Sequence, residues 1–136
     1  MKKRGAKNQK GVATLLMIVV IAAAVLTMAY SASMLGLGEL ELGYTVQKGG
    51  EAASLADGCL EEALYRIRLD QNYGLSEGDI SLTLFDGSCI IRITGNGDNR
   101  TISVLATIGQ YYKKIETDIV ISEGFININS WQEKED

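Results

Sequence analysis

The sequence predicts an α+β protein: a long N-terminal membrane helix continues into a small head, in which an amphipathic helix packs on a four-stranded antiparallel β-meander. Three patterns predict this fold. A basic leader precedes an apolar run, residues 51–69 repeat apolar side chains every three or four positions, and residues 80–121 repeat them every second position. The expected order is a leader at 1–11, a transmembrane helix at 12–36, a helical stalk at 37–69, a β head at 70–125 and a C-terminal tail at 126–136.

The apolar run is long enough to cross a membrane. Residues 12–30 read VATLLMIVVIAAAVLTMAY, and no charge lies between Lys10 and Glu39. At about 1.5 Å per residue this helix spans roughly 28 Å, close to the ~30 Å hydrocarbon core. All charged residues that precede the run are basic, whereas the acidic residues Glu39 and Glu41 follow it. By the positive-inside rule we expect a single pass through the inner (plasma) membrane, with the N-terminus cytoplasmic and the rest extracytoplasmic.

Three kinds of processing remain open for such a segment. A secretory signal peptide would be cut near Ala29-Tyr30-Ser31, although its apolar part is usually only about 7–15 residues long. A signal anchor would stay uncut. In the third case, cleavage between Gly11 and Val12 removes the basic leader and leaves the apolar helix on the mature chain.

A basic leader, a glycine and an apolar helix that starts at the next residue resemble the beginning of type IV prepilins and type II secretion pseudopilins. The stretch QKGVATLLMIVVIAAAVL is most similar to PilX-like minor pilins and GspK-like tip pseudopilins, and residues 49–73 resemble the segment that follows the membrane helix in PilX-like proteins. Many family members carry Glu at the fifth mature position, where this chain has Leu16. That departure fits a subunit that sits at a fibre tip or starts assembly rather than a major repeating subunit.

The resemblance implies a pilin-like fold and a structural, non-enzymatic role in a type IV pilus or type II secretion-type fibre. It further implies cleavage by prepilin peptidase between Gly11 and Val12, methylation of the new amine, and assembly with other pilins or pseudopilins through the N-terminal helix. The alternative is a membrane-anchored adhesion or sensor module with an uncleaved signal anchor. A secreted hydrolase is a third class, disfavoured by the lack of a recognisable catalytic constellation.

Residues 31–50 join the membrane segment to the head. They contain five glycines, each of which costs about 1 kcal/mol relative to Ala inside a helix. We expect helix on both sides, with local weakness near 36–43 and 49–50. A flexible tether and an extensible helical spine both remain open.

The predicted head combines one helix face with the inward face of a sheet. The face of the helix contains Ala52, Leu55, Ala56, Cys59, Ala63 and Ile67, and the alternating runs contain Ile80, Leu82 and Leu84, then Cys89, Ile91 and Ile93, then Ile102, Val104, Ala106 and Ile108, then Ile115, Ile119 and Ile121. The connections between runs are too short for crossover helices, so the strands must be antiparallel. After them, residues 125–131 could add an edge strand or a contact surface. We expect Phe125 to pack in the core, and Trp131 stays open.

The two cysteines test this arrangement. Cys59 lies on the apolar helix face and Cys89 on the inward face of its strand. Outside the cytoplasm disulfides persist, so a Cys59–Cys89 bridge is expected there. Two separate buried thiols are the alternative.

The composition disfavours catalysis, cofactors and nucleic-acid binding. The chain has no His, which removes the commonest general base and metal ligand, and neither cysteine can have a His partner. We therefore expect no catalytic residues, no metal and no cofactor; the loop 96–99 offers Ca²⁺ only one carboxylate, and a hairpin turn explains it better. Residues 12–136 carry 8 Lys or Arg against 17 Asp or Glu, a net −9, which is the wrong sign for a nucleic-acid surface.

Overall fold

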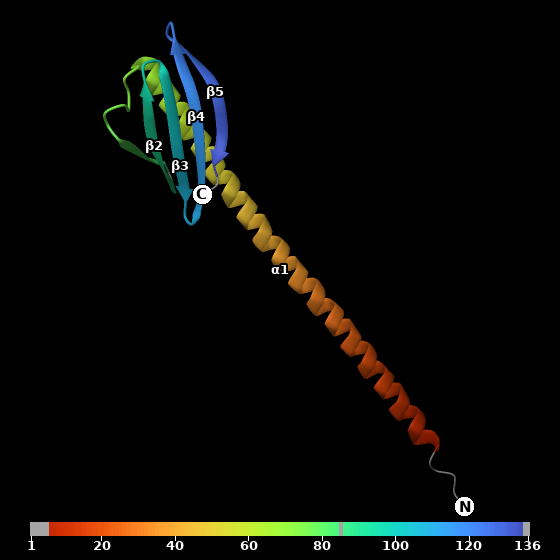
Figure 1. The fold of residues 1–136 in the computed structure, drawn as a ribbon. Helices are drawn as coiled ribbons and strands as arrows, with labels where there is room; N and C mark the ends of the chain where they lie inside the picture. Colours follow the sequence, from red (N-terminus) through yellow and green to blue (C-terminus); the bar gives the residue numbers. More distant parts are fainter. Residues whose placement is uncertain (1–5, 85, 135–136) are drawn as a thin grey trace, which may run out of the picture. The chain divides into compact units, whose positions relative to one another are not determined.

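The computed structural model of the chain describes residues 6–84 and 86–134, with only the backbone given for residues 6–10. One long helix precedes a five-stranded sheet (Figure 1). The elements are α1 (Ala6–Leu69), β1 (Asp79–Leu84), β2 (Gly87–Asn96), β3 (Asn99–Ile108), β4 (Tyr111–Ser122) and β5 (Phe125–Lys134). The chain divides into two compact units, Met1–Tyr44 and Thr45–Asp136, and each is described by itself. The predicted α+β class is confirmed.

The first unit consists of the N-terminal part of α1. Its side chains from Gly11 to Tyr44 are all exposed, since no other element of the unit packs on them. The helix runs without interruption through residues 31–50, despite the five glycines there. A Cβ placed on Gly36, Gly38 or Gly43 would meet no atom within 4 Å, so nothing that the structure describes makes these glycines necessary.

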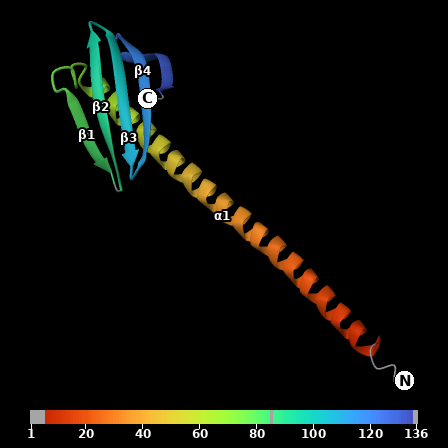
Figure 2. The same cartoon turned by 60° about the horizontal axis from the view of Figure 1, so that its bottom comes forward.

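In the second unit the last part of α1 lies on one face of the sheet. The strands pair antiparallel in chain order, β1-β2-β3-β4-β5, and Figure 2 shows β1 to β4 side by side. The helix contributes Ala52, Ala56, Cys59, Leu60, Ala63 and Ile67 to the core, and β2, β3 and β4 contribute Cys89, Ile91, Ile93, Ile102, Val104, Ala106, Ile115, Ile119 and Ile121. Four of the helical residues are Ala or Cys, whose short side chains let the helix approach the sheet closely.

The prediction of four strands was wrong by one, because β5 extends the meander at its edge. Its residues are mostly exposed on both faces, so the sequence lacks the alternation that marks the other strands. Phe125 was expected in the core, yet 71% of it is exposed. The register explains this difference: Phe125 pairs with Ser122, which lies on the outward face, whereas its neighbour Ile126 pairs with the buried Ile121.

The end of α1 is fixed by hydrogen bonds to the connection that leads into β1. The Asp70 amide donates to the carbonyl of Arg66 at 2.8 Å, and the Tyr73 amide donates to the carbonyl of Asp70 at 3.0 Å. Gly74 then adopts φ +77°, and a Cβ there would lie 2.6 Å from Cδ1 of Ile93. The positive φ favours glycine at this point, and a larger residue would also force the Ile93 side chain to move.

Candidate functional site

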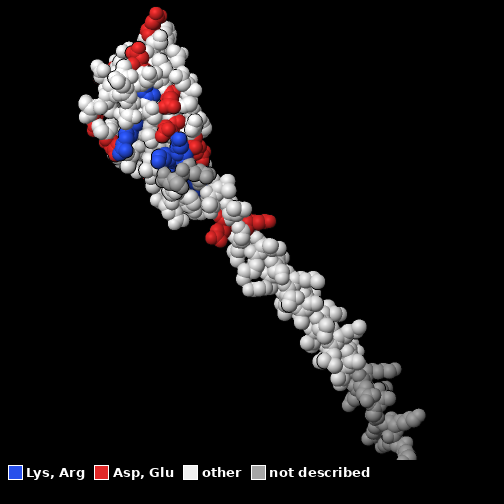
Figure 3. Space-filling model, viewed as in Figure 1, with Lys and Arg blue, Asp and Glu red and all other residues white. Residues whose placement is uncertain are grey.

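The exposed apolar surface of α1 is the first candidate site. The large apolar side chains of α1 between Val12 and Val46 are more than half exposed; Val12 itself is 59% exposed and Leu16 58%. By length and composition α1 is apolar enough to cross a membrane. On the face shown in Figure 3, the described part of the helix carries no charged side chain until it reaches a group of acidic ones. Most of the charged side chains on this face lie on the second unit. If this surface faced water, it would expose far more apolar area than soluble monomeric proteins usually do.

Three hydroxyl groups of this apolar segment donate hydrogen bonds to carbonyls of the helix itself. The hydroxyl of Thr27 donates to the carbonyl of Ala24 at 2.8 Å, and that of Ser31 donates to the carbonyl of Thr27 at 2.9 Å. Ser33 donates in the same way to the carbonyl of Ala29 at 2.9 Å. In hydrocarbon an unpaired hydroxyl costs several kcal/mol, so these bonds suit the helix for lipid or for contact with another apolar helix.

The predicted processing pair, Gly11 and Val12, lies near the start of α1, within the helix. A Cβ on Gly11 would meet nothing within 4 Å, so packing within the described chain does not require glycine there. Leu16 is the fifth residue when Val12 is counted as the first, and its side chain is exposed like its apolar neighbours. Cleavage at this pair stays a prediction.

Cys59 and Cys89, by contrast, are brought together from distant parts of the sequence. They form a disulfide that joins α1 to β2 across the helix–sheet interface, and both residues are fully buried. The linked positions are 30 residues apart. Both cysteines occupy the faces that the apolar periodicity predicts.

Charged groups on the outward face of the sheet link neighbouring strands. Arg92 donates two hydrogen bonds to the Asp79 carboxylate, at 2.6 and 2.7 Å, which hold the pKa of Asp79 below its ordinary value. The Asp118 carboxylate accepts from the hydroxyl of Thr101 at 2.7 Å and from that of Ser130 at 2.8 Å, and these bonds lower the pKa of Asp118. Each carboxylate therefore links neighbouring strands of the sheet. The 96–99 segment forms the turn between β2 and β3.

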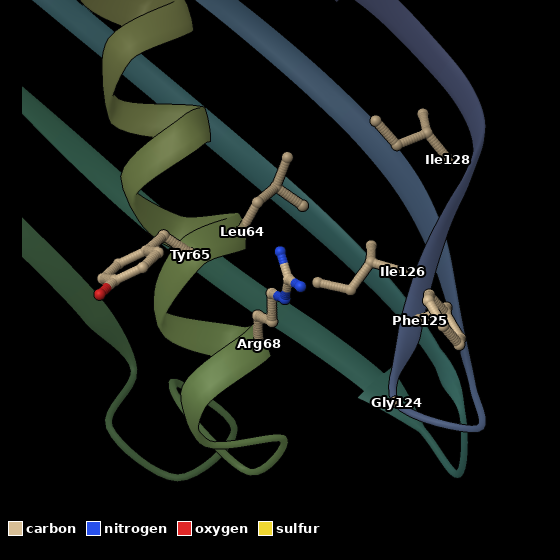
Figure 4. A pocket seen from close by; sticks show the side chains of 7 residues that line it. All are labelled: Leu64, Tyr65, Arg68, Gly124, Phe125, Ile126 and Ile128. Carbon is tan, nitrogen blue, oxygen red and sulfur yellow. The ribbon is translucent and has the colours of Figure 1, made fainter.

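Sequence reasoning missed a groove between α1 and the edge strand β5 (Figure 4). The groove has a volume of about 400 Å³. Its walls are Leu64, Tyr65 and Arg68 of α1 and Phe125, Ile126 and Ile128 of β5. Only knowledge of the fifth strand could have revealed it, because its two walls are about 60 residues apart in the sequence.

Comparisons with protein-family models, with curated proteins and with solved structures give no significant match for the chain. The architecture itself, a long N-terminal apolar helix followed by an antiparallel sheet, is compatible with a pilin-like fold.

Proposed function

We propose that the chain is a minor pilin-like or pseudopilin-like structural subunit of a type IV pilus or type II secretion-type fibre. The observation that carries the proposal is the fully exposed apolar surface of α1, which begins directly after Gly11 and meets its first acid at Glu39. A surface of this kind needs lipid or other apolar helices around it. A disulfide-linked head, suited to an oxidising compartment, supports the same interpretation.

In this proposal the precursor is anchored in the inner membrane with its basic leader in the cytoplasm. Prepilin peptidase cuts between Gly11 and Val12, and the new amine of Val12 is methylated. The mature helix then leaves the lipid and joins a bundle of helices from other pilins. The same apolar surface serves in both surroundings, because lipid tails and packed side chains both keep it from water.

The lack of a carboxylate at position 16 has a physical consequence for this assembly. A Glu in the apolar segment would be costly in lipid and would seek a cation on a neighbouring helix. Leu16 removes both the cost and the attraction. The subunit then depends on packing alone at this depth, which suits a rare or terminal position in a fibre.

The mature N-terminus tests the proposal. The full chain would be co-expressed with its prepilin peptidase, extracted from membranes, and sequenced from the N-terminus. A start at Val12 supports the pilin-like function. A start near Ala32 would indicate a secreted domain, and an intact Met1 would indicate a membrane-anchored adhesion or sensor module instead.

Two glycine-to-valine variants, one at the predicted cleavage site and one elsewhere in α1, provide a matched comparison. Gly11→Val should block cleavage while leaving the head folded, since a Cβ at Gly11 meets no described atom. Gly36→Val, at a helical glycine that is equally free of contacts, should leave cleavage intact. Equal processing of both variants would contradict a peptidase that recognises Gly11.

A further inference from the structure

The groove between α1 and β5 leaves large side chains without cover. Ile128, on the β5 wall, is 55% exposed. Tyr65 and Phe125 border the groove and are 59% and 71% exposed, but Figure 4 shows their rings directed away from the space between α1 and β5. An apolar recess of about 400 Å³ lies within the range of sites that bury part of a ligand. Unfilled, it leaves the aliphatic side chains of Leu64, Ile126 and Ile128 in contact with water.

Arg68 gives the groove its charge. Figure 4 shows its guanidinium between Leu64 and Ile126, directed from α1 toward β5. Within residues 6–84 and 86–134, Arg68 has no hydrogen-bond or ion-pair partner, in contrast to Arg66, which binds Glu62 at 2.7 Å. Arg68 is exposed, and a guanidinium beside apolar side chains favours a carboxylate that can accept two hydrogen bonds from it. A partner that covers the groove would exclude water and strengthen the pair.

The first unit carries a surface with the complementary chemistry. Leu35, Glu39 and Leu42 are spaced by four and three residues, so they share one face of α1. The two leucines are 72% and 65% exposed. Glu39 is exposed as well, and no described residue pairs with it. This face is apolar with a single central carboxylate.

We infer that this face of a second copy of the chain docks in the α1–β5 groove, where the Glu39 carboxylate accepts hydrogen bonds from the Arg68 guanidinium of the first copy. The leucines on either side of Glu39 would cover the exposed groove walls. The inference rests on the proposed function in one respect, since two copies placed one above the other at the end of a fibre would bring α1 of one copy beside the head of the other. It adds the identity of the partner and the pair that sets the contact.

Cysteine cross-linking in full-length protein tests the docking. Two differently tagged copies are co-expressed in the native host, one with Leu35→Cys and the other with Ile128→Cys, which leaves Glu39 and Arg68 intact. The native cysteines are paired with each other and do not compete. We expect a disulfide between the two tags on a non-reducing gel. Replacing Ile128→Cys with Tyr112→Cys should abolish the product, because Tyr112 is exposed on β4 and does not line the groove.

Charge reversal identifies the pair. Arg68→Glu in one copy, or Glu39→Arg in the other, should each lower the cross-linked fraction about ten-fold, and the two together should restore it. Glu41→Arg is the matched control and should change nothing, since it lies two residues away on a different face of the helix. Oxidised Cys59–Cys89 in every variant shows that the head has folded.

The outcomes separate this inference from the proposed function. No cross-link, a cross-link that ignores charge reversal, or an equal product with Tyr112→Cys overturns the docking, whatever the N-terminus is. A chain that starts at Val12 but gives no cross-link leaves the fibre function standing. A chain that keeps Met1 and still gives the charge-dependent cross-link supports the docking and contradicts the fibre function.

Discussion

Two threonines of the sheet differ in whether their hydroxyl has a partner. The hydroxyl of Thr117 is fully buried and makes no hydrogen bond to any described residue, whereas that of Thr101 donates to Asp118 at 2.7 Å. Thr117→Val removes a desolvated polar group at nearly constant volume, so we expect the free energy of unfolding to stay equal or rise by about 1 kcal/mol. Thr101→Val should lower it by about 0.5–1.5 kcal/mol.

Urea denaturation of the full chain in detergent, followed by Trp131 fluorescence, measures both changes. The contrast between the two variants is the informative quantity, because both make the same chemical replacement in neighbouring strands. A larger loss for Thr117→Val than for Thr101→Val would contradict the assignment of the unpaired hydroxyl.

Asp118 makes stability depend on pH. Hydrogen bonds from Thr101 and then Ser130 hold its pKa below the ordinary value of 3.8. A carboxyl whose pKa is lower in the folded state stabilises the fold at pH values above the unfolded pKa, and this contribution disappears as pH falls through the folded pKa. We therefore expect Asp118→Asn to be less stable than the wild type at pH 7 and the difference to shrink below about pH 4. A difference that stays constant from pH 7 to pH 2 would exclude this linkage.

Arg100 shows what residue patterns cannot predict. It is 7% exposed, and its guanidinium donates to the carbonyls of Gly97, Asn99 and Gln71. The last of these bonds, at 3.4 Å, joins β3 to the segment that follows α1. Because its acceptors are backbone carbonyls, one of them 29 positions away, no side-chain motif marks this contact.

At the scale of elements, the disulfide connects the only helix of the described chain to its sheet. Cross-linking positions 30 residues apart restricts the unfolded chain and contributes roughly 3–4 kcal/mol on the chain-entropy estimate. The double variant Cys59→Ala/Cys89→Ala should lose about that amount plus the cost of two small cavities. Urea midpoints of wild type, with and without reductant, and of the double variant measure it. Equal midpoints for the oxidised and reduced wild type would contradict a stabilising bridge.

The elements that sequence could predict are those with one buried face. Apolar residues recur every three or four positions in residues 51–69 and every second position in residues 80–121, because one side of each element meets the core. Cys59, Cys89 and Ile102 lie on those predicted faces. Strand β5 gives no such signal since both of its faces meet solvent over most of its length. The glycines of residues 31–50 suggested weakness, yet the helix continues through them. Each glycine costs about 1 kcal/mol, but a break would require a second, unfavourable helix nucleus on the other side.

The whole molecule has an uneven charge distribution that should set its orientation. The leader has five basic residues, and residues 12–136 carry a net −9. Because cations beside a membrane helix stay in the cytoplasm, the leader should hold the N-terminus inside and send the head outward. The oxidation state of Cys59 and Cys89 shows on which side of the membrane the head lies, since the two form a stable disulfide only in an oxidising compartment.

Replacing the five basic leader residues with Gln should therefore convert the disulfide into free thiols in a large share of the molecules. The positions are Lys2, Lys3, Arg4, Lys7 and Lys10. Cells would be treated with acid to trap thiols, the protein alkylated with a mass-shifting maleimide, and the fraction of modified Cys59 and Cys89 read from a gel. Lys48→Gln, which removes a cation on the other side of the apolar segment, should leave both cysteines oxidised. Complete oxidation in the leader variant would show that the basic residues do not determine the orientation. Free thiols in the wild type would place the head in the cytoplasm and contradict the expected orientation.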